Sequence, residues 1–102
     1  MKKNYHFKEK LSYWPGAGGG WHFLPIPKDE SKRIREDSAS KGGEKYFASV
    51  KVEVKINKSV WETSLFYTKL SQAFILPVNA RIRRAEDIQT GEIVNFSFKI
   101  NK

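Results

Sequence analysis

The 102-residue chain contains no cysteine. Disulfide bonds, thiolate nucleophiles and cysteine-based zinc sites are therefore excluded. Long apolar runs are also missing, because no stretch approaches the roughly 20 residues that cross a bilayer. The N-terminal segment has a basic start but no apolar segment behind it, so we expect no signal peptide. These absences favour a soluble, cytoplasmic protein with no membrane contact.

Histidine is nearly as scarce, since His6 and His22 are the only two in the sequence. A zinc site usually takes three or four protein ligands, and a general base needs an orienting partner. The spacing of the chain places no serine or acid so as to complete a catalytic triad. We therefore expect no catalytic residue, no metal and no cofactor.

Positive charge, by contrast, is in excess: 19 Lys and Arg stand against 11 Asp and Glu, for a net charge of +8. The excess is spread along the chain, +5 in residues 1–51 and +3 in residues 52–102. Hydrophobic residues make up 39% and aromatic residues 14%, which argues against disorder despite the charge. At this length we expect a single domain over residues 1–102.

Apolar and polar residues alternate over several stretches, which predicts strands with one buried face. Six strands are expected, at residues 5–13, 21–24, 46–56, 60–67, 73–76 and 93–100. Two helices are expected, a very polar one at residues 28–37 and a short one at residues 80–86 with Asn79 as its N-cap. Residues 38–43 and 68–72 are predicted loops, and Asn57 and Gly91 suit turns at positive φ.

The order of these elements repeats. Pro25 and Pro77 each end a short apolar strand, and each precedes a helix in which an isoleucine stands between arginines. Two ββαβ pseudo-repeats are therefore predicted, at about residues 5–57 and 58–101. Interlocked, they would close a six-stranded β-barrel with a helix at each end. The alternative is a simple α+β sheet, in which two strands end in Leu-Pro by chance and not because the halves of the chain are repeats.

An ordered series of motifs resembles a bacterial family known only as domain of unknown function 1905. The likeness covers nearly the whole chain, through the segments WHFLP (21–25), SVKVEV (49–54), WETSLF (61–66), LPV (76–78), IRRA (82–85) and GE (91–92). The resemblance implies a mainly β fold with two short helices: a double-split β-barrel, helix-capped at both ends. Swapped-hairpin transition-state regulators and antitoxins, which bind DNA as dimers, share that fold. The family supplies no established activity or catalytic residue. Because the repeat would supply both halves from one chain, we expect a monomer or a weak homodimer.

Basic side chains gather in the two counterpart helix segments. They would form two related patches that contact the phosphates of nucleic acid, made of Lys32, Arg33, Arg35, Arg81, Arg83 and Arg84. The alternative is that these are solvated helix faces, paired locally with the acids Glu30, Glu36, Glu86 and Asp87, since the charge of the chain is dispersed.

A glycine-rich segment separates two tryptophans near the N-terminus. It lacks both the Gly-Lys-Ser/Thr ending of a phosphate loop and the third glycine of a dinucleotide fingerprint. One interpretation is a plain hairpin connection. The other is a loop that closes over a small ligand and uses Trp14, Gly18, Gly19, Gly20 and Trp21.

Taken together, these features predict a non-catalytic binding or interaction module with nucleic acid as the first candidate partner. The alternative is a small-molecule-binding protein or an enzyme that uses the loop between Trp14 and Trp21. A third hypothesis is a structural domain that pairs with a partner protein through a free sheet edge.

Overall fold

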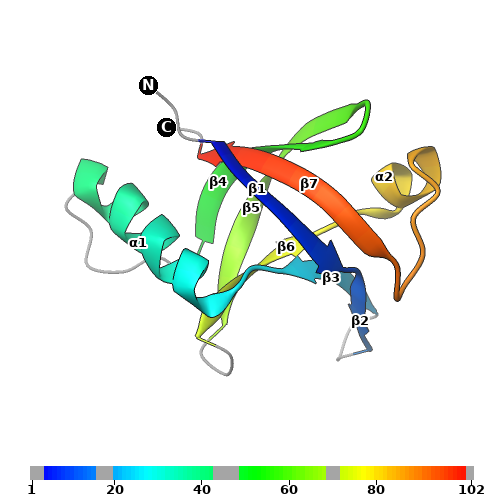
Figure 1. Cartoon of the computed structure of the whole chain (residues 1–102), viewed down its shortest axis with the longest axis horizontal. Helices are drawn as coiled ribbons and strands as arrows, with labels where there is room; N and C mark the ends of the chain where they lie inside the picture. The colour runs from blue at the N-terminus through cyan, green and yellow to red at the C-terminus, as the bar shows by residue number, and fades with distance from the viewer. Residues whose placement is uncertain (1–3, 16–19, 43–48, 69–71, 101–102) are drawn as a thin grey trace.

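The structure is a computed structural model. It describes residues 4–15, 20–42, 49–68 and 72–100 and, of residues 37–42, the backbone alone. These residues form one seven-stranded sheet and two helices (Figure 1). The elements are β1 (Asn4–Lys10), β2 (Ser12–Trp14), β3 (Trp21–Pro25), α1 (Lys28–Gly42), β4 (Ser49–Ile56), β5 (Ser59–Thr68), β6 (Ala73–Pro77), α2 (Ala80–Ala85) and β7 (Ile93–Ile100).

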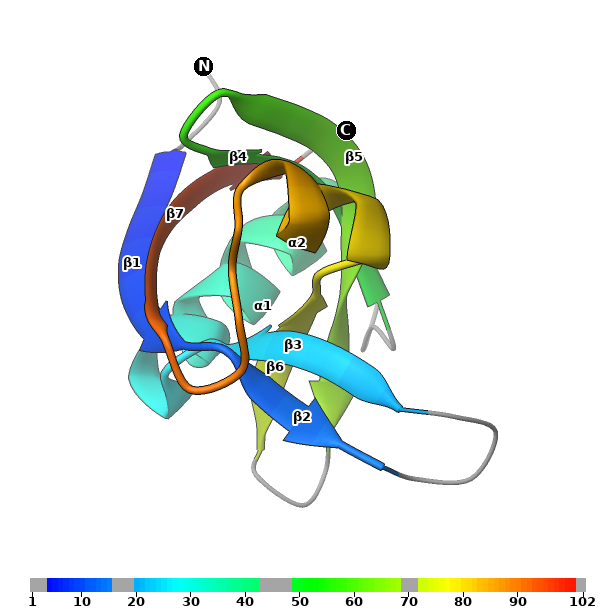
Figure 2. The ribbon, with the colours of Figure 1, turned by 90° about the vertical axis from the view of Figure 1, so that its right-hand side faces the viewer.

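The strands lie in the order β1-β7-β4-β5-β6-β3-β2, and every neighbouring pair is antiparallel. Figure 2 shows that the sheet curls into a half-barrel, with β1 and β2 at its two edges. The helices lie at opposite ends of the long axis (Figure 1). The prediction of a mainly β chain with two helices is confirmed, and the double-split barrel stays a prediction.

The core lies inside the curl and follows the alternation of the sequence. Strands β4 and β7 share one burial pattern, in which every second side chain is buried. Val54 and Phe98, both almost fully buried, are direct cross-strand partners at the centre of this pair. The buried side chains of the two strands are Val50, Val52, Val54, Ile56, Val94, Phe96, Phe98 and Ile100.

The predicted strand over residues 5–13 is two strands, so the sheet has seven strands among the described residues and not six. The break falls at Leu11, whose N–H donates to the Glu92 carbonyl at 2.9 Å and whose carbonyl accepts from the Gly91 N–H at 2.8 Å. Before Leu11 the chain pairs with β7, and after it with β3. The alternation of apolar and polar residues could not reveal this break. Leu11 lies an even number of residues after Tyr5, and both side chains are buried, so the pattern continues through the break.

Helix α1 is longer than predicted, because it continues through the expected loop at residues 38–43 as far as Gly42. Before Gly42, the last residue of the helix, that segment contains Ala39 and Lys41 and neither proline nor glycine, so no strong helix breaker interrupts it. The first part of the predicted strand at 46–56, residues 46–48, lies outside the described residues. Asn57 and Gly91 take the positive φ that the turns require, 51° and 95°.

A buried serine attaches α1 to the sheet. Ser31 is fully buried; its hydroxyl donates to the Ile26 carbonyl at 3.3 Å and accepts from the Phe74 N–H at 2.9 Å. One turn further along, Ile34 is also fully buried. The first half of α1 is thus held against β6 by one polar bridge and one apolar contact.

Replacement of Ser31 by alanine should therefore destabilise the domain. Ser31→Ala leaves the buried Phe74 N–H without its acceptor, and we expect the free energy of unfolding to fall by about 1–3 kcal/mol in urea denaturation. The matched control is Ser12→Ala, because the exposed Ser12 hydroxyl donates only to the nearby Lys10 carbonyl. We expect its cost to stay within about 0.5 kcal/mol. Equal losses in the two variants would contradict the bridging role of Ser31.

Most strand pairing joins one half of the chain to the other. The pairs β1–β7, β3–β6, β4–β5 and β4–β7 connect residues 4–56 to residues 59–100. Only β2–β3 and β5–β6 pair within a half in the described sheet. Since an isolated two-stranded hairpin is marginal in water, neither half holds a stable sheet of its own.

Separate fragments 1–57 and 58–102 should accordingly be unfolded alone and should assemble when mixed. Dispersed amide resonances in an NMR spectrum would appear only in the equimolar mixture. A dispersed spectrum from either fragment alone would show that the interlocking of the halves is not required for folding.

Candidate functional site

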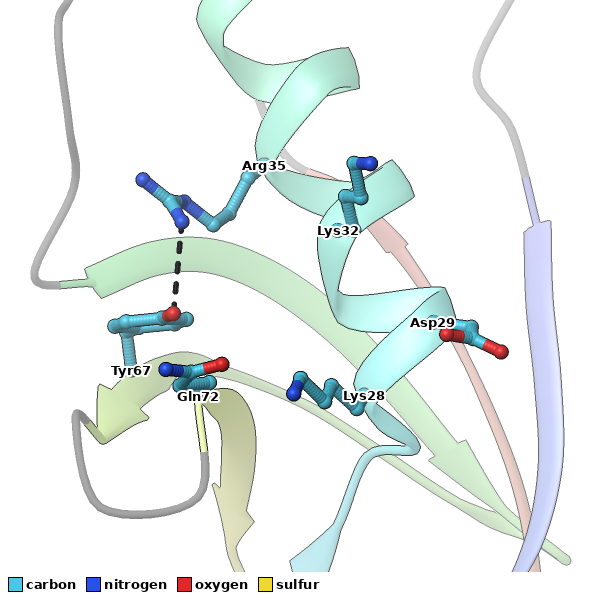
Figure 3. A pocket seen from close by; sticks show the side chains of 6 residues that line it. All are labelled: Lys28, Asp29, Lys32, Arg35, Tyr67 and Gln72. Atoms are coloured by element: carbon cyan, nitrogen blue, oxygen red, sulfur yellow. Dashed lines mark hydrogen bonds between the residues drawn. The ribbon is translucent and has the colours of Figure 1, made fainter.

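A pocket with a volume of about 350 Å³ lies between α1 and the ends of β5 and β6 (Figure 3). Three cationic side chains of α1 face it, Lys28, Lys32 and Arg35, at the i, i+4 and i+7 positions of one helix face. The other lining residues are Asp29, Tyr67 and Gln72. The structure therefore brings together two of the predicted basic residues, Lys32 and Arg35.

Arg35 is held in place by Tyr67. Its guanidinium carbon lies 4.8 Å from the centre of the Tyr67 ring, and its Nη1 donates to the Tyr67 hydroxyl at 3.5 Å. The Tyr67 ring in turn packs edge-on against the buried Phe74, with ring centres 5.3 Å apart. Figure 3 shows the Asp29 carboxylate turned away from Arg35 and Tyr67.

Arg33 does not join this pocket. Its side chain is 68% exposed and forms an ion pair with Glu30, with 3.9 Å between Arg33 Nη1 and Glu30 Oε1. The predicted patch of Lys32, Arg33 and Arg35 is therefore divided. Local pairing, the alternative interpretation, holds for Arg33 alone among these three in the described part of the chain.

Helix α2 presents the second basic set at the other end of the molecule (Figure 1). Asn79 caps it as predicted, because its side-chain oxygen accepts from the Ile82 N–H at 2.9 Å. Ile82 is buried, and Arg81 and Arg84 are exposed. Arg83 is half-buried, and its Nε donates to the Val78 carbonyl at 3.2 Å. The two basic sets thus form separate sites and not one patch.

Of the two acids expected to neutralise α2, Glu86 and Asp87, the first is engaged elsewhere. The Glu86 carboxylate accepts from Asn57 Nδ2 at 3.0 Å and from the Ser59 hydroxyl. The hydrogen bond from Ser59, followed by that from Asn57, lowers the pKa of Glu86. Over the described residues, no ion pair reaches Arg81, Arg83 or Arg84; the ion pairs found there are Arg33–Glu30 and Lys99–Glu53.

The β2–β3 hairpin places aromatic rings beside α2. Tyr13 and His22 are cross-strand partners with ring centres 4.8 Å apart, and the His22 carbonyl accepts from the Val78 N–H at 3.0 Å. Burial, and then the charge of Arg83, lowers the pKa of His22. Trp14 and Trp21 are also partners, and the alternation of strand side chains puts them on the opposite face of the hairpin. Their exposed fractions are 62% and 45%.

Gly20 makes room for one of these rings. A side chain at Gly20 would overlap the Tyr13 ring, which covers that position. Of the five residues predicted for a ligand loop, Trp14, Gly20 and Trp21 are described, whereas Gly18 and Gly19 lie outside the described residues. The structure therefore defines the base of this hairpin as an aromatic surface, and loop closure over a ligand stays a prediction.

A family model described as a domain of unknown function, DUF1905, matches residues 7–98. The chain belongs to the DUF1905 family. The resemblance found in the sequence motifs is thereby confirmed. Comparison with curated proteins gives no match. The DUF1905 assignment carries no activity with it, so the function must be argued from the geometry of the sites.

Membrane-spanning helices and metal-binding clusters are both absent from the described residues of the DUF1905 chain. None of the described helices combines the length and the apolar character needed to span a membrane. Within the same residues, no three or more of its His, Asp and Glu side chains are grouped so as to hold a metal ion.

Sequence reasoning missed the partners that lie far apart in the chain. Lys28 could have been found from its helical spacing to Lys32 and Arg35. Tyr67 and Gln72 carried no such signal, because they reach the pocket only through the fold of β5 and β6. The hydrogen bond between His22 of the hairpin and Val78, just before α2, was equally hidden.

The lowered pKa of His22 predicts a pH dependence of stability. Below its ordinary value of 6.5, the unfolded chain takes up a proton that the folded chain does not. The free energy of unfolding should therefore fall as the pH drops from about 6.5 to the lowered pKa of His22, and this group adds no further loss below that. Urea denaturation at several pH values should show this slope in the parent and a smaller one in His22→Gln. Identical slopes would contradict the prediction.

Proposed function

We propose that this DUF1905 chain is a non-catalytic module that binds single-stranded nucleic acid through α2 and the β2–β3 hairpin. One observation carries the proposal: three arginines of α2 form no ion pair among the described residues, and the His22 carbonyl of the aromatic hairpin accepts a hydrogen bond from Val78, which lies two residues before that helix. Single-strand binding proteins combine these two features, a basic track for the backbone and rings for the bases.

The charge of α2 fits the phosphate backbone. Arg81 and Arg84 are exposed and free to contact phosphate oxygens, and the net charge of +8 adds a long-range attraction to any polyanion. Arg83 instead donates to the Val78 carbonyl, and the Val78 N–H donates to the His22 carbonyl of the hairpin. Val78 thus connects the helix to the hairpin through two hydrogen bonds.

The aromatic side chains fit unstacked bases. Tyr13 is 47% exposed and lies against His22 on the face of the hairpin beside α2, while Trp14 and Trp21 are exposed on the other face. Bases in a duplex are already stacked on one another and do not reach such rings. A six-residue α2 is also too short to act as a major-groove recognition helix. Both points favour a single strand.

We also propose that the half-barrel is a double-split β-barrel made of two pseudo-repeats. The pairing of β3 with β6 supports this, because it sets Leu24 opposite Leu76, and the two Leu-Pro motifs therefore meet symmetrically. The pairing of β4 with β7 is equally symmetric around Val54 and Phe98. This symmetric pairing supports the proposed kinship with DNA-binding regulator domains.

The exposed arginines should contribute directly to affinity. Fluorescence anisotropy of labelled single-stranded DNA, over a salt series, should show weaker binding by the double variant Arg81→Gln/Arg84→Gln. Loss of two phosphate contacts should reduce the log–log salt slope by about 1.4. Tyr13→Ala should weaken binding by roughly tenfold, with little change in slope, because stacking is not ionic.

The control for charge is Lys51→Gln/Lys55→Gln, which removes the same two charges from the exposed face of β4. It should retain nearly the parent affinity at moderate salt. The proposal would be wrong if both double variants lost affinity equally, or if duplex DNA bound as tightly as the single strand.

A further inference from the structure

We propose that the pocket between α1 and the ends of β5 and β6 is a second, separate site, which binds the phosphate group of a small phosphate monoester. This inference goes beyond the proposed function. It concerns a different end of the molecule and shares no residue with α2 or the β2–β3 hairpin (Figure 1).

The described residues give the pocket a positive field. Lys28, Lys32 and Arg35 line it against one carboxylate, that of Asp29. Figure 3 shows the Asp29 carboxylate on the far side of Lys28 from Arg35 and Tyr67. The next acid of the helix, Glu30, pairs with Arg33 outside the pocket. A dianion entering between Lys28 and Arg35 therefore meets cations on more than one side.

Arg35 is arranged to receive an oxyanion. Its guanidinium has five N–H donors, and the structure engages its Nη1 with the Tyr67 hydroxyl. The ring of Tyr67 lies under the guanidinium and restricts its rotation. The remaining donors keep the planar geometry that matches two oxygens of a phosphate group.

The helix that carries these cations is fixed in position. Ser31 and Ile34, both fully buried, alternate along α1 with the pocket-facing Lys28, Lys32 and Arg35. The Ser31 bridge to Phe74 ties the helix to β6, the strand that Gln72 precedes. In Figure 3 the Lys28 ammonium and the Gln72 amide point toward the same space beside Tyr67. Such prior ordering lowers the entropic cost of binding.

The size and charge of the pocket favour a small monoester over a nucleic acid backbone. Its volume of about 350 Å³ falls at the lower end of the range for small-molecule sites. Three cations can balance the two negative charges of a monoester, whereas each phosphodiester of a nucleic acid carries one. A short phosphorylated metabolite therefore matches the site better than a polynucleotide.

The test uses the full chain and ribose 5-phosphate as the monoester probe, with dimethyl phosphate as the diester probe and sodium chloride at matched ionic strength. ¹H–¹⁵N spectra should show saturable shifts at Gln72 and the Arg35 side chain with ribose 5-phosphate alone. Lys32→Gln and Arg35→Gln should each weaken binding by roughly tenfold, and Tyr67→Phe by less, since it removes one positioning hydrogen bond.

Arg33→Gln is the matched control, because it removes the same charge from the same helix outside the pocket. It should leave binding of ribose 5-phosphate unchanged. The inference is overturned by shifts that do not saturate, by equal effects of dimethyl phosphate or chloride, or by an equal loss in Arg33→Gln.

Lys32 is exposed, so its variant keeps the test valid even if Arg35→Gln unfolds. Single-stranded DNA binding by Lys32→Gln, measured in parallel, separates this result from the proposed function.

Discussion

The chain passes from one edge of the sheet to the other within a single residue, because the curl of the half-barrel brings the end of β1 next to the start of β2. Leu11 is that residue, and its backbone N–H and carbonyl are both bonded to the segment that precedes β7. This passage places the β2–β3 hairpin next to the start of β7, and the pairing of β3 with β6 places His22 next to Val78, two residues before α2. Tyr13 and His22 of the hairpin and Arg83 of α2, which are distant in the sequence, come near one another for this reason.

The Glu86 carboxylate at the end of α2 is held by bonds made for structural reasons. The turn between β4 and β5 uses Asn57 and Ser59 to hold this carboxylate. These hydrogen bonds tie the turn to α2, and the described residues contain no ion pair between Glu86 and an arginine of the helix. The carboxylate keeps its negative charge, because the same hydrogen bonds lower its pKa. Composition alone does not reveal which groups hold this acid.

Sequence patterns predicted the parts of the fold that depend on local order. The alternation in β4 and β7, the Asn79 cap and the turns at Asn57 and Gly91 are all short-range signals, and the structure contains each of them. The change of partner at Leu11 and the contact of Arg35 with Tyr67, 32 residues away, depend on strand order, which alternation does not encode. For the same reason the sequence predicted Lys32 and Arg35 as binding residues but did not predict the pocket that they line. Arg33 was grouped with them although it faces elsewhere.

Helices α1 and α2 occupy corresponding places in the proposed pseudo-repeats, yet we propose different ligands for them. They differ in length, 15 residues against six. At 1.5 Å per residue, α1 extends about 22 Å and α2 about 9 Å. The longer helix can lie along β6, bury Ser31 and Ile34, and still present a face that encloses a pocket with β5. The shorter one buries Ile82 alone, and its Arg81 and Arg84 are exposed to solvent. Under the two proposals, the helix that packs along β6 therefore encloses a pocket for a small anion, whereas its counterpart presents an open surface to a polynucleotide.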